Sequence, residues 1–123
     1  MVISSADAQM VSPGMTPAVA LFRSLADATR LRIVQRLASG ETRVVDLTRE
    51  LGLAHSTGSK HLACLRDCGL VEYRVQGRQS FYALTRPELM DLLRAAEGVL
   101  AATGSAVVLC PTYGTGQRSP VTG

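Results

Sequence analysis

Apolar residues recur at intervals of three and four in three successive stretches of the N-terminal half, and this spacing predicts three helices. The first covers residues 16–26, with Thr16 as its candidate cap. Asp27 precedes the second, over 28–38, and the third covers 44–51. The positions predicted to face inward on the second and third helices are Leu31, Ile33, Val34, Leu37, Val45, Leu47 and Leu51.

The next stretch predicts a fourth helix up to Gly69, a residue type that suits a helix end because it tolerates positive φ. Ser56 is the candidate N-cap, since its hydroxyl can accept a bond from a first-turn amide. The core-facing stripe of this helix consists of Gly58, Leu62 and Leu65. A short turn at 52–54 joins it to the third helix, so the pair predicts a helix-turn-helix.

After Gly69 the apolar period changes to two. This predicts strands over 70–75 and 79–84, joined by a hairpin tip at 76–78. The tip is basic. A basic hairpin directly after a helix-turn-helix is typical of the wing of a DNA-binding domain.

Thr85 and Glu88 have the spacing of a capping box, which predicts the start of a last helix. This helix has a wide apolar stripe, and together with the first helix it is the expected surface of a twofold dimer. We therefore expect a mainly α fold with a small β-hairpin, a dimeric winged helix-turn-helix. The predicted organisation is a flexible arm over 1–15, one domain over 16–103 and a tail over 104–123.

Composition narrows the possible functions of this 123-residue chain. A net charge of +3 permits binding to nucleic acid, and with 4% aromatic residues and no Trp a stacking platform for single strands is not expected. No apolar run approaches the roughly 20 residues of a membrane span, and the N-terminus lacks the pattern of a leader. We therefore expect a cytoplasmic protein whose three cysteines are reduced thiols.

The predicted helix-turn-helix and wing carry short polar and basic side chains where double-stranded operator DNA would lie. The candidate groove contacts on the fourth helix are Ser56, Thr57, Ser59 and Lys60. The wing candidates, for phosphate or the minor groove, are Arg74, Arg78 and Gln79. The alternative is that these residues form an ordinary solvated face.

Cys64 and Cys68 lie four residues apart on the fourth helix and off its apolar stripe, so that their side chains can close on one metal ion. The alternative is that they are small hydrophobes packed beside Leu65. His61, one turn before Cys64, is either a fourth ligand or a structural or DNA-side residue. Cys110 taken alone reads as an inert tail thiol.

Three separated segments resemble, in order, the ArsR/SmtB family. They are Leu-Ala-Asp-Ala-Thr-Arg-Leu-Arg-Ile at 25–33, His-Leu-Ala-Cys-Leu-Arg-Asp-Cys-Gly-Leu-Val at 61–71 and Gly-Arg-Gln-Ser-Phe-Tyr-Ala-Leu at 77–84. The resemblance covers about residues 16–103 and implies a homodimeric repressor that leaves its operator when an inducer binds. In its mycobacterial cadmium and lead sensors, two recognition-helix cysteines and one from the partner's tail hold the metal. The ligands implied here are Cys64, Cys68 and Cys110.

Three thiolates favour a soft, large inducer such as Cd(II) or Pb(II), and Zn(II) is less expected because it usually takes four ligands. Two other sites used in the family lack their ligands in this chain. Arg43-Val44-Val45 stands where some members carry Cys-Val-Cys, and Asp91 and Glu97 stand on the last helix without a His.

The sequence is also compatible with other functions. A thiol-redox or persulfide switch on the same fold would form a bridge to Cys110, because Cys64 and Cys68 on one helix are poorly placed for a mutual disulfide. A winged helix that binds only protein is a further alternative. An enzyme such as an arsenate reductase is not expected, because Cys64 is mid-helix without an arranged base.

Overall fold

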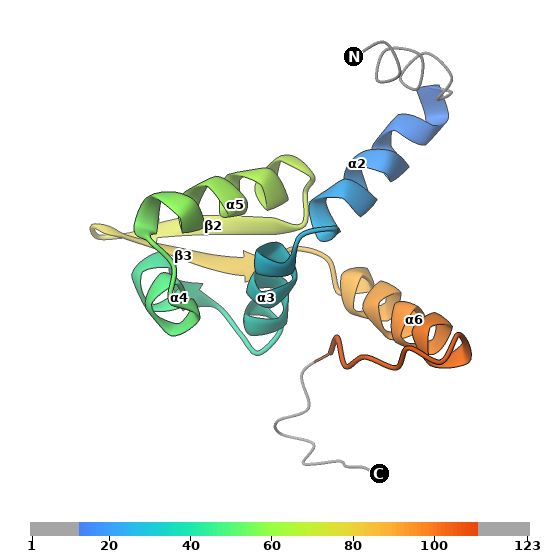
Figure 1. Ribbon diagram of the computed structural model, residues 1–123. Coiled ribbons are helices and arrows are strands. Elements are labelled where there is room, and N and C mark those ends of the chain that lie inside the picture. The colour runs from blue at the N-terminus through green and yellow to red at the C-terminus, as the bar shows by residue number, and fades with distance from the viewer. Residues whose placement is uncertain (1–12, 111–123) are drawn as a thin grey trace, which may run out of the picture.

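The computed structural model describes residues 13–110 (Figure 1). Its elements are η1 (Pro13–Met15), α2 (Thr16–Leu25), α3 (Ala28–Leu37), β1 (Thr42–Arg43), α4 (Val44–Leu51), α5 (His55–Asp67), β2 (Val71–Gln76), β3 (Gln79–Leu84) and α6 (Glu88–Ala102). The order confirms the predicted winged helix-turn-helix: mainly α, with α4 and α5 forming the helix-turn-helix and β2 and β3 forming the wing. The arm residues 13–15 form a 3-10 turn, which the sequence analysis did not predict. The rest of the predicted arm, and the tail beyond Cys110, lie outside the described residues.

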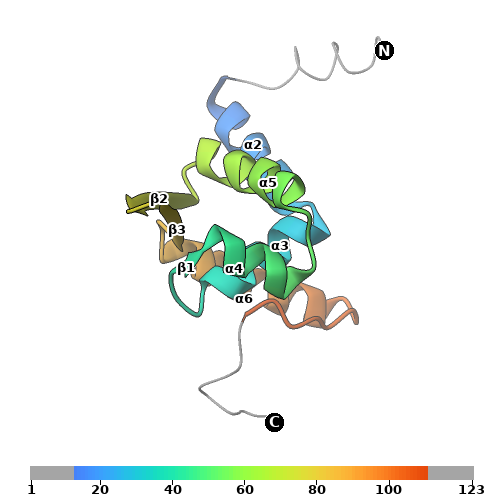
Figure 2. The same ribbon diagram turned by 90° about the vertical axis from the view of Figure 1, so that its left-hand side faces the viewer.

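The hydrophobic core has its centre between α3, α4 and α5 and includes further side chains of α2, β2 and α6. Figure 2 shows how these elements are arranged. Its most deeply buried large side chains are Ile33, Val34, Leu47, Leu62 and Leu65. All five were predicted to face inward. The prediction was wrong for Val45, which is 45% exposed, whereas Thr48 on the same helix is 5% exposed.

Thr48 is buried because α4 and α5 meet there without an intervening side chain. A Cβ added at Gly58 would overlap the Cγ2 methyl of Thr48, so only glycine allows this approach. Gly52, with φ of 68°, ends α4 in the left-handed conformation and turns the chain into α5. The position of α5 therefore depends on two glycines.

The three helix caps predicted at Thr16, Ser56 and Thr85 are wrong. Asp27 does cap α3, accepting a bond from the Arg30 amide at 2.9 Å, and this bond lowers the pKa of its carboxyl below the usual range. Thr16 and Ser56, however, lie inside the first turns of their helices, because α2 begins one residue and α5 two residues earlier than these caps require. Thr85 donates its amide to the Leu70 carbonyl and ends the wing instead, so α6 starts at Glu88 without a side-chain cap.

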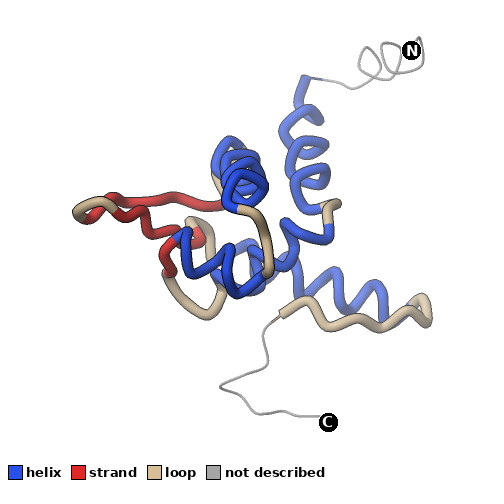
Figure 3. Tube along the Cα trace, turned by 60° about the vertical axis from the view of Figure 1, so that its left-hand side comes forward, coloured by secondary structure: helices blue, strands red, loops and turns tan. Residues whose placement is uncertain are grey.

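The wing is an antiparallel hairpin in a three-stranded sheet of order β1-β3-β2. Strand β1, which was not predicted, has only two residues and pairs Thr42 with Tyr82. On the wing, the rings of Tyr73 and Tyr82 stack at 5.3 Å between centroids. Figure 3 shows the hairpin projecting from the helices, with α2 and α6 at the opposite end of the molecule. Within residues 13–110 no helix is long and apolar enough to cross a membrane.

Candidate functional site

The first turns of α5 present the predicted groove contacts to solvent. Ser56, Thr57 and Lys60 are exposed, and Ser59 is half-buried. Because Gly58 and Leu62 face the core on the other side of the helix, α5 is amphipathic in the way a groove-binding helix requires. The structure therefore brings these four residues onto one accessible helix end.

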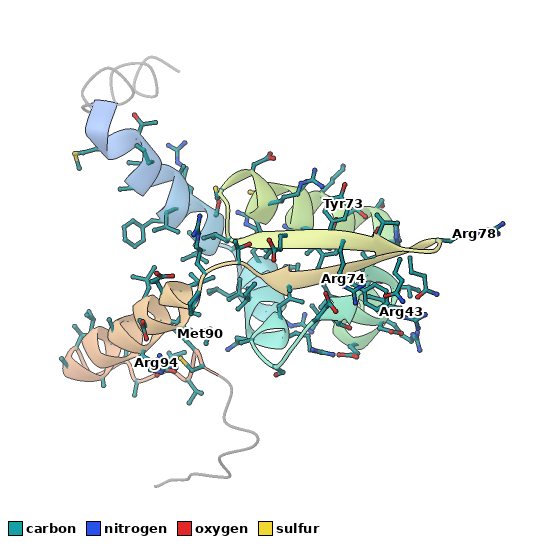
Figure 4. The ribbon with its side chains drawn as sticks, turned by 180° about the vertical axis from the view of Figure 1, so that it is seen from behind. Arg43, Tyr73, Arg74, Arg78, Met90 and Arg94 are labelled. Atoms are coloured by element: carbon teal, nitrogen blue, oxygen red, sulfur yellow. The ribbon has the colours of Figure 1, made fainter. Side chains whose placement is uncertain are left out.

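The wing divides its three candidates between solvent and the protein. Arg78 lies at the hairpin tip and points away from the domain (Figure 4). Arg74 instead donates to both carboxylate oxygens of Glu41, at 2.8 and 2.9 Å, with its guanidinium over the Phe81 ring. This hydrogen bonding lowers the pKa of the Glu41 carboxyl and raises the pKa of Arg74. Arg74 is already paired, so of the two arginines Arg78 is the one presented outward.

Gln79 is also engaged, because its side-chain oxygen accepts a bond from Arg43 at 2.9 Å. Arg43 in turn donates to both oxygens of Asp46, at 2.7 and 3.0 Å, and Arg49 donates to the same carboxylate at 2.6 Å. The bonds from Arg43 lower the pKa of Asp46 and raise that of Arg43. This basic cluster at the base of the wing was not predicted, although the three-residue spacing of Arg43 and Asp46 is a recognisable helix charge pair.

The two helix thiols face α2, in a region where the sequence analysis placed no partner. Cys64 and Cys68 are both half-buried, and both are free thiols. The Ser24 hydroxyl lies 2.7 Å from the Cys68 sulfur and 3.8 Å from the Cys64 sulfur. Because one small hydroxyl contacts both sulfurs, the two thiols face the same space, as two ligands of one ion must.

Cys110 is held elsewhere in the protomer, against α6 and α3. The Glu97 carboxylate accepts the amides of Leu109 and Cys110, at 2.5 and 2.8 Å, and Gln35 donates to the Leu109 carbonyl at 3.1 Å. We call Gln35 and Glu97 the tail-docking pair. Burial, and then the negative charge of Glu97, raise the pKa of the Cys110 thiol. Within residues 13–110 no three Cys, His, Asp or Glu side chains gather as a metal site, so one protomer does not bring Cys110 to the helix pair.

Loss of Glu97 from the tail-docking pair is expected to expose the Cys110 thiol. Glu97→Ala leaves two amides without their acceptor, so iodoacetamide should alkylate Cys110 severalfold faster than in the wild type. Mass spectrometry of the tail peptide in metal-free protein measures the rate. Glu88→Ala, an exposed glutamate in the first turn of the same helix, is the matched control. Equal rates in both variants would contradict a docked tail.

His61 contacts the linker between α2 and α3. Its Nδ1 lies 3.2 Å from the Arg30 guanidinium and 3.8 Å from the Asp27 carboxylate. Arg30 also donates to the Ser24 carbonyl at 2.6 Å. These contacts give His61 a structural position, one of the roles that the sequence left open, in place of a ligand position beside the thiols.

A sequence profile described as "Bacterial regulatory protein, arsR family" matches residues 27–73. The regulator CmtR of Mycobacterium tuberculosis is 38% identical over 104 residues, which cover 84% of this chain and 88% of CmtR. A probable mercury resistance operon repressor of Streptomyces lividans is 37% identical over 91 residues, 74% of this chain and 72% of that protein. A homodimeric winged helix-turn-helix DNA-binding domain from Mycobacterium bovis has a similar structure, with a TM-score of 0.66 and 27% identity over 72% of this chain and 82% of that one.

Proposed function

This chain belongs to the arsR family of bacterial regulatory proteins, and from that membership we propose that it is a metal-responsive transcriptional repressor. It binds operator DNA as a homodimer and releases it when Cd(II) or Pb(II) binds the thiolates of Cys64, Cys68 and Cys110. The relatives named above are regulators and repressors, a class without catalytic activity. We place its action in the cytoplasm, where the thiols stay reduced.

One observation carries the proposal: the thiol pair and the groove contacts share a single helix. Lys60 and Cys68, which is the C-cap of α5, lie eight positions apart, about 12 Å at the rise of an α-helix. The two thiols face the Ser24 hydroxyl, and the polar residues at the other end face solvent. Any reorientation of α5 by its thiols therefore changes how its first turns meet the groove.

The donor set favours a soft ion. Cys64 and Cys68 provide sulfur, and His61 is engaged by Arg30 and Asp27. Three thiolates suit Cd(II) and Pb(II), whereas Zn(II) usually takes four ligands in a tetrahedron. The described residues of one protomer offer two of the three thiols together, which supports a third ligand, Cys110, supplied by the partner subunit.

Release of DNA follows from these residues. Once the partner's tail is joined to Cys64 and Cys68, α5 is held in an orientation, or covered by a segment, that does not fit the groove. Metal and operator then bind antagonistically, with a reciprocal coupling of typically about 5–150-fold. The dimer itself is proposed to form through α2 and α6, whose exposed apolar side chains include Phe22 and Val99.

The test is an anaerobic titration of reduced protein with Cd(II), following the ultraviolet thiolate-to-metal band in wild type and Cys110→Ser. A band that saturates at one metal per protomer and weakens in Cys110→Ser is the expected result. Fluorescence anisotropy with a palindromic duplex, selected from a random library, then measures release. Absence of a band in the wild type, with release caused only by oxidant, would contradict metal sensing and favour the redox switch.

Arg78→Ala is expected to weaken operator binding and to reduce the slope of log affinity against log salt by about one, because one phosphate contact is lost. Arg94→Ala is the matched control, since it removes the same charge from α6, far from the wing (Figure 4). Anisotropy across a salt series measures both slopes. If the two variants lose affinity equally, the wing tip does not contact DNA.

A further inference from the structure

Ser24 is a buried serine in the last turn of α2, with 3% of its surface exposed. Its hydroxyl lies 2.7 Å from the Cys68 sulfur and 3.8 Å from the Cys64 sulfur. In the part of the chain that the structure describes, these sulfurs are the hydrogen-bond partners found for that hydroxyl. The residue is forty positions before Cys64, and no pattern in the sequence connects the two.

A buried hydroxyl must donate to some acceptor, because leaving it unsatisfied costs about 1–3 kcal/mol. Here the partner is sulfur, and the Cys68 sulfur also lies 3.7 Å from the Ala20 carbonyl oxygen of α2. These contacts hold the Cys68 sulfur beside the last turn of α2.

The backbone of Ser24 is tied to the same helix by a second route. Its carbonyl accepts a bond from Arg30 at 2.6 Å, and the Arg30 guanidinium lies 3.2 Å from Nδ1 of His61 on α5. Ser24 thus contacts α5 through its side chain near Cys68 and through Arg30 one to two turns earlier. Two sets of contacts therefore join the end of α2 to α5.

We propose that Ser24 is a positioning residue of the thiol site: its hydroxyl bonds the Cys68 sulfur, keeps both sulfurs directed to one point, and links the site to α2. The inference rests on the proposed metal-sensing function. Groups that hydrogen-bond a metal ligand orient it, and their loss typically lowers metal affinity about 10–100-fold. Since α2 is also part of the proposed dimer surface, the same bond couples the thiols to the geometry of the dimer.

Ser24→Ala removes only the oxygen and favours the helix, so α2 is expected to persist. In anaerobic competition titrations this variant should bind Cd(II) about tenfold more weakly than wild type at unchanged stoichiometry. The ratio of operator affinities without and with Cd(II) should fall as well. A purely structural role would instead change the stability of the metal-free protein and leave this ratio unchanged.

Ser24→Cys tests the geometry directly. In a Cys110→Ser background it places a third sulfur beside Cys64 and Cys68 within one protomer, so the part of the thiolate-to-cadmium band lost with Cys110 should return. Ala26→Cys in the same background is the matched control, because Ala26 is exposed two residues further along. It adds a thiol at the same end of α2 without directing it at the pair.

The results of these titrations distinguish failure of the proposed metal sensing from failure of the proposed role of Ser24. Absence of a cadmium band in the wild type overturns the proposed function and this inference with it. If the wild type gives the band, the inference alone is overturned when Ser24→Ala matches wild type within twofold in Cd(II) affinity and in coupling, and Ser24→Cys gains no more absorbance than Ala26→Cys. Weaker binding in Ser24→Ala together with recovery in Ser24→Cys supports it.

Discussion

Cys68→Ser is expected to abolish the release of operator DNA by Cd(II) while the metal-free protein still binds the duplex. The ratio of operator affinities without and with Cd(II) should fall from the typical range of about 5–150 to about one. The reason is geometric, because Cys68 is one of two sulfurs that face the same point beside Ser24. With Cys68 replaced, only Cys64 of the two helix thiols remains, so the helix no longer offers two sulfurs to one ion. Anisotropy titrations at fixed salt measure the ratio.

The substitution is conservative for the fold. Serine keeps a polar atom beside the Ser24 hydroxyl, so α2 and α5 stay in contact, and circular dichroism with thermal melting of the metal-free variant checks this. Cys110→Ser is the comparison variant, and it should retain weak Cd(II) binding through Cys64 and Cys68. Full release by Cd(II) in Cys68→Ser would place the sensor away from α5 altogether.

Local patterns were sufficient to predict most of the fold. Helix α4 has the predicted bounds, and β3 coincides with the predicted second strand of the hairpin, because the apolar period changes sharply at Gly69. Strand β1 could not be predicted, since its two residues become a strand only by pairing with β3. The caps failed for a related reason: tertiary contacts, here the bond from Thr85 to Leu70, decide where a helix begins.

The candidate site was partly predictable. Exposure of Ser56, Thr57 and Lys60 follows from helical periodicity alone. Pairing of Arg74 with Glu41 could not be foreseen, because 33 residues separate them and only the sheet brings them together. The contact of Ser24 with both helix thiols has the same origin. Sequence periodicity places a side chain on a face, whereas its partner depends on the packing of distant segments.

Gly58→Ala is expected to destabilise the protein, although glycine to alanine usually stabilises an exposed helix by about 0.5–1 kcal/mol. The added Cβ overlaps the Cγ2 methyl of Thr48. That methyl cannot rotate away freely, because the Thr48 hydroxyl donates to the carbonyls of Val44 and Val45, at 3.0 and 3.2 Å, in a buried position. Overpacking of a core costs about 1–3 kcal/mol, so the net loss should be about 1–2 kcal/mol by urea unfolding.

Two further variants test whether the contact between Gly58 and Thr48 causes this loss of stability. Gly98→Ala on α6 meets open space, so it should be neutral or stabilising at the same protein concentration. Thr48→Ser removes the methyl and keeps the hydroxyl, and combined with Gly58→Ala it should restore most of the lost stability, with an interaction energy of about 0.5–3 kcal/mol. Because α4 and α5 meet at this point, Gly58→Ala should also weaken operator binding, and Thr48→Ser should rescue it. Equal stabilisation by alanine at both glycines would mean that the two helices are further apart than the structure has them.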